Sequence, residues 1–148
     1  MPKSEIMKKT ILFICTHNSA RSQIAEGLVN HFFSDEWEAQ SAGTEQTFVK
    51  PFAIKALAAA GIDISHHTSK TMAVFQDQTF DVVVTVCDSA KETCPFFPGK
   101  KVIHQSFADP SNVEGTNEEK LAAFCRTCDE IKAWLNTNLP RIAEELNT

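Results

Sequence analysis

The 148-residue chain lacks three features: a long apolar segment, a surplus of basic residues and a glycine-rich cofactor motif. Its longest early apolar run, residues 11–14, is too short for a signal peptide or a membrane span. The formal net charge of −5 disfavours a nucleic acid or an anionic membrane as partner. The missing dinucleotide fingerprint argues against a nicotinamide cofactor. We therefore expect a cytoplasmic protein that binds neither membrane nor nucleic acid.

The chain also lacks internal repeats, low-complexity segments and linker-like stretches, so we expect a single domain over residues 1–148. Its hydrophobic content of 43% suits a globular fold with a sizeable core. Cys125 and Cys128 form one CxxC at helical spacing, but no second pair accompanies them and no histidine stands at zinc-site spacing. We expect packing roles for these two thiols and no metal site.

Short β-branched runs alternate with helical patterns along the chain. Strands are expected at residues 10–14, 37–42, 80–86 and 101–104. Helices are expected at residues 20–33, 51–60 and 117 to about 138, with one helical turn at 71–75 and a bend or break at Pro140. The first helix should bury Ile24, Leu28 and Phe32. This alternation predicts an α/β fold, a four-stranded and mostly parallel sheet with helices on both faces.

Two cysteines directly follow predicted strands. Cys15 comes after the first strand, and Cys87 comes after the strand at residues 80–86. The carboxyl ends of parallel strands meet at one edge of a sheet, where ligands bind. Neighbouring strands lie roughly 4.8 Å apart, which is compatible with the Cα separation of about 5.5 Å in a disulfide. If these strands are neighbours, the two thiols are within reach of each other.

The segment CTHNSAR, residues 15–21, connects the first strand to a helix. Such a loop can turn its backbone N–H groups inward and, with the helix dipole, form a cradle for an anion. Arg21 adds a guanidinium that matches a tetrahedral oxyanion. The positive field favours the thiolate form of Cys15, to which Ser22 can donate a hydrogen bond. The expected oxyanion-binding residues are Thr16, His17, Asn18, Ser19, Ala20 and Arg21. The alternative is a buried structural cysteine and a surface arginine.

Several segments together resemble one family. CTHNSARSQIAEG is similar to the phosphate-binding loop shared by low-molecular-weight tyrosine phosphatases and thioredoxin-coupled arsenate reductases. VTVCDSAKETCPFFPG, which contains Cys87 and Cys94, and FADP, which contains Asp109, resemble the arsenate reductase branch. SAGTE, GIDISHHTSK and FCRTCDEI add further matches, so that the resemblance extends from about residue 10 to residue 134.

The resemblance implies a relay of three cysteines. Cys15 would attack the arsenic of bound arsenate, while Asp109 acts as general acid on the departing oxygen. Cys87 would then attack Cys15, releasing arsenite, and Cys94 would move the disulfide to Cys87–Cys94. Thioredoxin would reduce that bond. The resemblance further implies a monomer without a bound cofactor, in which phosphate and sulfate compete with arsenate.

Two other functions stay open on the sequence alone. A phosphomonoesterase acting on phosphotyrosine or small aryl phosphates needs only Cys15, Arg21 and Asp109. A non-enzymatic redox sensor needs only Cys15 and Cys87 and has no use for an anion loop. The reductant is open as well, between thioredoxin and glutaredoxin. Asp109 precedes a proline and on its own is typical of a turn.

Some reductases of this branch bind potassium beside the loop. Asn18, Glu26 and Ser41 match residues of that site, but Lys70 stands where those relatives have an acid. An ammonium group at this position can take the place of the cation. The resemblance therefore implies that this chain needs no potassium.

Overall fold

The computed structural model describes residues 8–87 and 96–147. Four strands form one sheet: β1 (Lys9–Ile14), β2 (Trp37–Ala42), β3 (Phe80–Thr85) and β4 (Gly99–His104). Their order is β2-β1-β3-β4, and each neighbouring pair is parallel. The predicted α/β fold with a four-stranded parallel sheet is confirmed.

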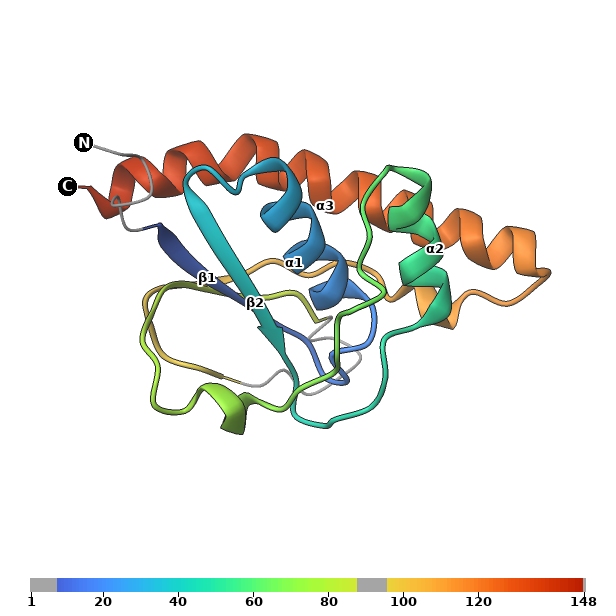
Figure 1. Cartoon of the computed structure of the whole chain (residues 1–148), viewed down its shortest axis with the longest axis horizontal. Helices are drawn as coiled ribbons and strands as arrows, with labels where there is room; N and C mark the ends of the chain where they lie inside the picture. The colour runs from blue at the N-terminus through green and yellow to red at the C-terminus, as the bar shows by residue number, and fades with distance from the viewer. Residues whose placement is uncertain (1–7, 88–95, 148) are drawn as a thin grey trace.

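Three α-helices cover one face of the sheet, namely α1 (Arg21–Phe32), α2 (Pro51–Ala59) and α3 (Asn117–Leu146) (Figure 1). The opposite face carries the short 3-10 helix η2 (Met72–Phe75), where the Phe75 and Phe80 rings meet edge to face with centroids 5.6 Å apart. A second 3-10 helix, η3 (Pro110–Asn112), follows β4. Helical elements thus lie on both faces as predicted, although the second face has only this single turn among the described residues.

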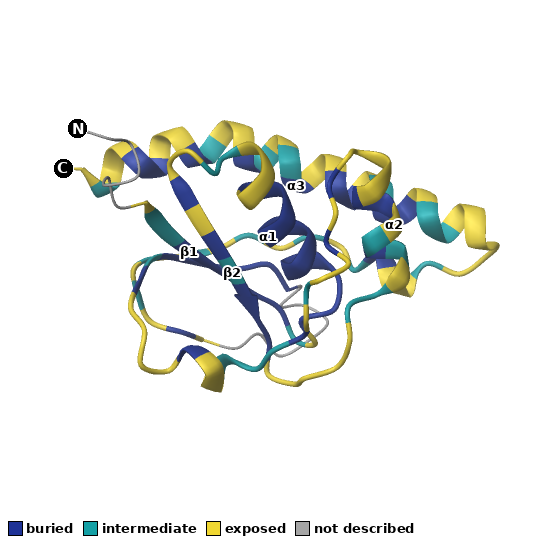
Figure 2. Cartoon of the chain, viewed as in Figure 1, coloured by how far each residue is buried: buried dark blue, intermediate teal, exposed yellow. Residues whose placement is uncertain are grey.

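Burial on both faces explains the apolar sequence of β1. Ile11 and Phe13 pack under the α-helices, whereas Leu12 and Ile14 belong to the cluster on the η2 side. Successive strand residues point to opposite faces of the sheet. When both faces are covered, every residue of the strand is buried, and the sequence is continuously apolar instead of alternating between apolar and polar residues. In Figure 2 the colour of β1 changes from teal to the dark blue of buried residues along its length, and α3 is exposed on its outer side.

The helix expected to end near residue 138 does not break at Pro140, because α3 continues through this residue to Leu146. Proline inside a helix costs about 3 kcal/mol, since it lacks a backbone N–H and crowds the preceding turn. Leu139 and Ile142, on either side of Pro140, are fully buried, and burying one such side chain contributes about 1.5–3 kcal/mol. Tertiary burial therefore outweighs the local preference, and Pro140 itself lies on the exposed side.

The prediction for the buried face of α1 is correct at two of three positions. Ile24 and Leu28 are buried, but Phe32 is 44% exposed. Phe32 is the last residue of α1, where the helix leaves the core, and the Lys132 ammonium lies 4.2 Å from its ring centroid. Along the described ranges no helix has an apolar stretch of the length that a bilayer requires.

Candidate active site

The two cysteines predicted at the sheet edge follow adjacent strands. Ile14 of β1 pairs with Thr85 of β3, so Cys15 lies one residue beyond this pair and Cys87 two residues beyond it. Both cysteines are buried, with exposed fractions of 2% and 0%, in the core cluster beneath the α-helices. Cys15 is a free thiol, whereas Cys87 is disulfide-bonded. Cys94 lies outside the described residues.

The loop after β1 has its carbonyl groups turned outward. Four consecutive carbonyls accept hydrogen bonds from donors outside the loop: Thr16 from Thr44 N–H (2.9 Å), His17 from Thr47 Oγ1 (2.9 Å), Asn18 from Gln23 Nε2 (3.1 Å) and Ser19 from Lys50 N–H (2.8 Å). In a planar trans peptide, an outward carbonyl directs the next residue's N–H inward. The N–H groups of residues 17–20 are therefore directed to the inside of the loop, which is the arrangement that an anion cradle requires.

Asn18 is the centre of the loop. Its φ of 50° lies in the left-handed region, which asparagine tolerates better than most residues. The side chain is fully buried and donates to Ser22 Oγ at 2.9 Å and Ser41 Oγ at 3.0 Å. Its Oδ1 accepts from Gln23 Nε2 at 2.9 Å and from the Lys70 N–H at 2.8 Å. Four hydrogen bonds to three segments of the chain thus hold the loop in this conformation.

Ser22 Oγ lies 2.9 Å from Cys15 Sγ. Asn18 Nδ2 donates to Ser22 Oγ, and a hydroxyl oxygen can accept a second hydrogen bond, so either Ser22 or the Cys15 thiol can be the donor in this contact. A donor at this distance stabilises the negative charge of a thiolate. The predicted contact between Ser22 and Cys15 is therefore present.

Arg21 begins α1 and is buried beside the loop. Its Nη1 donates to the Phe107 carbonyl at 3.3 Å, and its Nη2 lies 3.6 Å from Asp109 Oδ2. Asp109 Oδ1 also accepts from the Ser111 N–H at 2.9 Å and caps η3. Asp109 therefore occupies a turn, as its sequence context suggests, and its carboxylate also lies beside Arg21.

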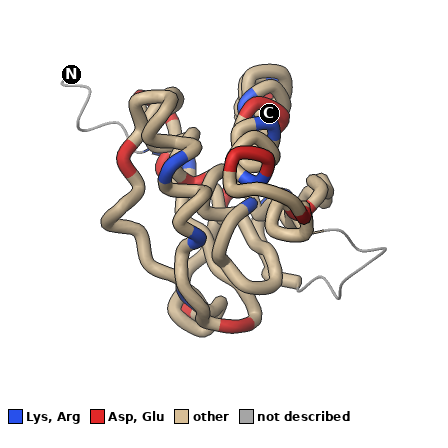
Figure 3. The backbone as a smooth tube through the Cα atoms, turned by 90° about the vertical axis from the view of Figure 1, so that its right-hand side faces the viewer, with Lys and Arg blue, Asp and Glu red and all other residues tan. Residues whose placement is uncertain are grey.

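A hollow of about 350 Å³ opens at the mouth of the loop. It is lined by His17, Ser19, Thr47, Phe48, Lys50, Asp109, Ser111 and Asn112. The His17 ring points outward, with Nε2 3.5 Å from Glu45 Oε2, and both side chains are more than half exposed. Exposed pairs of this kind contribute little to stability. Elsewhere on the surface acidic and basic residues are interleaved, as along α3 (Figure 3).

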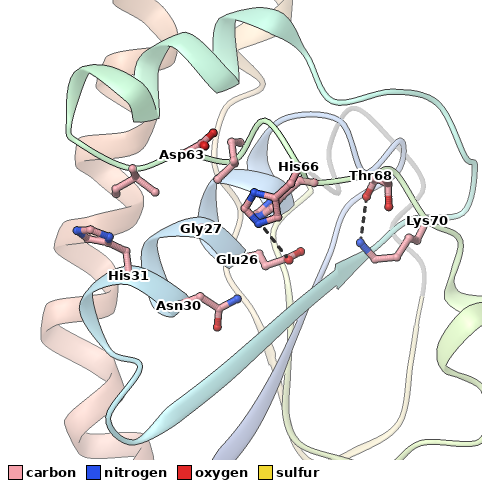
Figure 4. A pocket seen from close by; sticks show the side chains of 11 residues that line it. Glu26, Gly27, Asn30, His31, Asp63, His66, Thr68 and Lys70 are labelled. Carbon is pink, nitrogen blue, oxygen red and sulfur yellow. Dashed lines mark hydrogen bonds and ion pairs between the residues drawn. The ribbon is translucent and has the colours of Figure 1, made fainter.

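A second, polar pocket of about 410 Å³ lies between α1 and residues 62–70 (Figure 4). Glu26 is buried in its wall, where Ser41 Oγ donates to Oε1 at 2.5 Å and His67 Nε2 lies 3.7 Å from Oε2. Burial raises the pKa of Glu26, although the Ser41 hydrogen bond and the Lys70 ammonium oppose this rise. Burial also lowers the pKa of His67 to about 4, so its ring is neutral at pH 7.

Comparisons with known proteins identify the family. Residues 10–148 match the family described as low molecular weight phosphotyrosine protein phosphatase. The arsenate reductase of Halalkalibacterium halodurans is 47% identical over 131 residues, which cover 88% of this chain and 94% of that protein. The chain belongs to the arsenate reductase family. The arsenate reductase of Bacillus subtilis (strain 168) is 45% identical over 124 residues, covering 83% of this chain and 89% of that protein.

Solved structures agree with this membership. A structure described as an arsenate reductase in the phosphate binding state has a TM-score of 0.72 and 27% identity, covering 90% of this chain and 98% of that chain. A low molecular weight protein tyrosine phosphatase from T. tengcongensis shares the fold, with a TM-score of 0.71 and 24% identity over 90% of this chain and 99% of that chain. The family predicted from the motifs is therefore confirmed, and this member is an enzyme.

The remaining cysteines lie away from the loop. Cys128 packs in the main core cluster, and burial raises the pKa of its thiol to about 12, so it stays protonated and unreactive. Cys125, one helical turn earlier on α3, is half-buried at the rim of the same cluster. These positions agree with the packing roles predicted for both.

The potassium site of some relatives does not fit the residues present here. Asn18 presents its amide hydrogens, not its oxygen, to Ser41. The Lys70 ammonium donates to the Thr68 carbonyl at 3.0 Å, and its positive charge opposes the rise that burial causes in the pKa of Glu26. A second cation beside Glu26 would meet this positive charge.

We expect potassium to leave arsenate turnover unchanged when it replaces sodium at fixed ionic strength. The reason is that the Lys70 ammonium already supplies the positive charge beside Glu26. Lys70→Asp should create a potassium dependence, because it exchanges the ammonium for a carboxylate ligand. Steady-state kinetics of both proteins in the two salts test this, and clear stimulation of the wild type by potassium would contradict it.

Several residues of the site were not predicted from the sequence. The donors that turn the loop carbonyls outward include Thr47 and Ser69, and Gly43 packs against the loop backbone. Thr47 and Ser69 are polar residues in segments without regular structure, so their sequence context resembles that of any loop residue. Of these three residues, only Gly43 lies in a segment, SAGTE, whose resemblance to the family could have marked it as part of the site.

Proposed function

We propose that the protein reduces arsenate to arsenite through a thiol–disulfide relay that begins at Cys15. The observation that carries this proposal is the Cys15 environment. A free thiol makes a hydrogen bond with Ser22, begins the loop that ends at Arg21, and follows the strand adjacent to that of Cys87. The identity of the substrate is inferred from relatives named arsenate reductase, which are 45–47% identical to this chain.

In the first step the cradle and Arg21 hold the oxygens of arsenate while the Cys15 thiolate attacks arsenic. An S–As bond forms, an As–O bond breaks, and the departing oxygen leaves as water with a proton from Asp109. The Asp109 carboxyl lies at the mouth of the loop, 3.6 Å from the Arg21 guanidinium, which places it beside the anion. The hydrogen bond from Ser22 supports the thiolate until it attacks.

In the second step the Cys87 thiolate attacks Cys15 Sγ. An S–S bond forms, the S–As electron pair stays on arsenic, and As(V) leaves as As(III) in arsenite. Cys94 then attacks Cys87 and sets the Cys15 thiolate free. In the structure Cys87 is disulfide-bonded while Cys15 is a free thiol, which is the state these steps require after Cys15 has been released.

Thioredoxin is the proposed reductant. Its dithiol would reduce the disulfide at Cys87 and be oxidised in turn. Support comes from a solved relative described as a Corynebacterium glutamicum thioredoxin-dependent arsenate reductase, with a TM-score of 0.69 and 25% identity over 95% of this chain and 65% of that chain. Phe96, two residues after Cys94, is 72% exposed and offers apolar surface to a protein partner.

NADPH oxidation in the presence of thioredoxin, thioredoxin reductase and arsenate tests the proposal. The wild type should consume NADPH only when arsenate is present, and Cys94→Ser should lose multiple turnover. Sustained turnover by Cys94→Ser would mean that thioredoxin reaches the Cys15–Cys87 bond directly. If the wild type does not respond to arsenate but hydrolyses an aryl phosphate, the proposed reductase function is incorrect and a phosphatase function takes its place.

A further inference from the structure

The His17 carbonyl is held by two hydroxyl groups from distant parts of the chain. Thr47 Oγ1 donates to it at 2.9 Å and Ser69 Oγ donates at 3.1 Å. Ser69 is 5% exposed, and its Oγ accepts a hydrogen bond from the Thr47 N–H at 2.9 Å. This acceptance leaves the hydroxyl hydrogen of Ser69 for His17, so the three residues form one connected set.

The orientation of this carbonyl decides where the next N–H points. With the His17 carbonyl outward, the Asn18 N–H is directed into the cradle. Asn18 has a φ of 50°, a conformation that residues other than glycine rarely adopt. The peptide between these two residues therefore depends on outside donors to stay in place.

Residues 68–70 make hydrogen bonds to both residues of the His17–Asn18 peptide or to side chains that contact them. Besides Ser69 at the His17 carbonyl, the Lys70 N–H donates to Asn18 Oδ1 at 2.8 Å. Gln23 Nε2, which also donates to the Asn18 carbonyl, reaches the Thr68 carbonyl at 3.0 Å. Residues 68–70 thus lie along the outer side of the loop, and the Ser69 hydroxyl faces a carbonyl and not the anion.

We propose that Ser69 and Thr47 are positioning residues for oxyanion binding, which keep the Asn18 N–H aimed at the anion by holding the His17 carbonyl outward. This inference rests on the proposed function, in which the loop binds a tetrahedral oxyanion. Loss of either hydroxyl removes one hydrogen bond to the His17 carbonyl, so the Asn18 N–H is less firmly oriented toward the anion. The expected result is a rise of roughly 5–10-fold in the phosphate dissociation constant and in the KM for arsenate.

The variants separate positioning from a merely structural role. Thr47→Val removes the hydroxyl at constant shape, whereas Thr47→Ser keeps it and should restore wild-type phosphate binding. Ser69→Ala removes the other donor. Thr127→Val is the control for loss of a threonine hydroxyl outside the loop, because Thr127 Oγ1, like Ser69 Oγ, belongs to a buried residue and donates to a carbonyl, that of Ala123 at 3.1 Å within α3.

The assay is protection of Cys15 from iodoacetamide by inorganic phosphate in the reduced protein, read by mass spectrometry of the Cys15 peptide. Thr47→Val and Ser69→Ala should need roughly 5–10-fold more phosphate than the wild type, Thr47→Ser and Thr127→Val. Lower melting temperatures with unchanged phosphate protection would overturn the positioning role. A wild type that phosphate never protects would overturn the anion site itself, and with it this inference.

Discussion

Cys87→Ser is expected to stop arsenate turnover and leave the hydrolysis of an aryl phosphate intact. Reduction needs Cys87 to attack the Cys15 sulfur, because only that step leaves the electron pair on arsenic. Phosphate transfer needs only Cys15, Arg21 and Asp109, and none of its steps involves Cys87. The fall in arsenate turnover should be roughly 10³-fold or more, as for other removals of an essential nucleophile. Coupled NADPH oxidation and p-nitrophenol release measure the two activities.

Two further serine variants serve as controls for this result. Cys15→Ser should lose both activities, since each begins with attack by that thiolate. Cys125→Ser should retain both, because Cys125 is half-buried on α3, away from the anion loop. Multiple turnover of arsenate by Cys87→Ser would show that another thiol attacks the arsenic adduct directly, and the relay would then be incorrect.

Gly43→Ala is expected to damage the anion loop directly. A Cβ atom at Gly43 would lie 2.6 Å from the Thr16 carbonyl oxygen, 2.8 Å from the Cys15 carbonyl oxygen and 2.9 Å from the Asn18 nitrogen. These are backbone atoms of the loop, so the loop itself has to move. Overpacking of this kind costs about 1–3 kcal/mol of unfolding free energy. A displacement near 1 Å at a catalytic group lowers the rate by about 10²-fold.

Gly61→Ala is the matched control for Gly43→Ala. Gly61 has a φ of +81° at the end of α2, and a Cβ there meets no atom within 4 Å. The change should reduce the unfolding free energy by about 1–2 kcal/mol through backbone strain and leave kcat/KM unchanged. Urea denaturation and steady-state kinetics compare the two variants. Wild-type kcat/KM in Gly43→Ala would contradict the importance of this close contact.

The edge of the sheet that holds the site could be predicted because the signals for it are local. Buried parallel strands read as continuous apolar runs, so the ends of β1 and β3, and the cysteines after them, are visible in the sequence. The anion loop is likewise a contiguous segment between a strand and a helix. Pro140 shows the limit of local rules, since burial of its neighbours in α3 outweighs the preference of proline to end a helix.

The residues that donate hydrogen bonds to the loop carbonyls could not be predicted, because the fold brings them close to the loop from distant parts of the sequence. Ser69 and Thr47 lie 52 and 30 residues from the His17 carbonyl that they share. A serine or threonine in an irregular segment has many possible acceptors, and only the folded chain selects one. The predicted burial of Phe32 is wrong for a related reason. The spacing of apolar residues along a helix does not reveal where the helix leaves the core. Cys94 lies outside the described residues, and its role stays a prediction.

The outward carbonyls of the anion loop also have a consequence for biosynthesis. Their donors come from Gln23, Thr44, Thr47, Lys50 and Ser69, so the last of them leaves the ribosome more than fifty residues after Cys15. Until then the nascent chain has no cradle, and Cys15 is an ordinary thiol with ordinary reactivity. The environment of the Cys15 sulfur is therefore created by folding and not by the loop segment alone. Before folding, Cys15 lacks the local positive field that activates a cysteine toward oxidation.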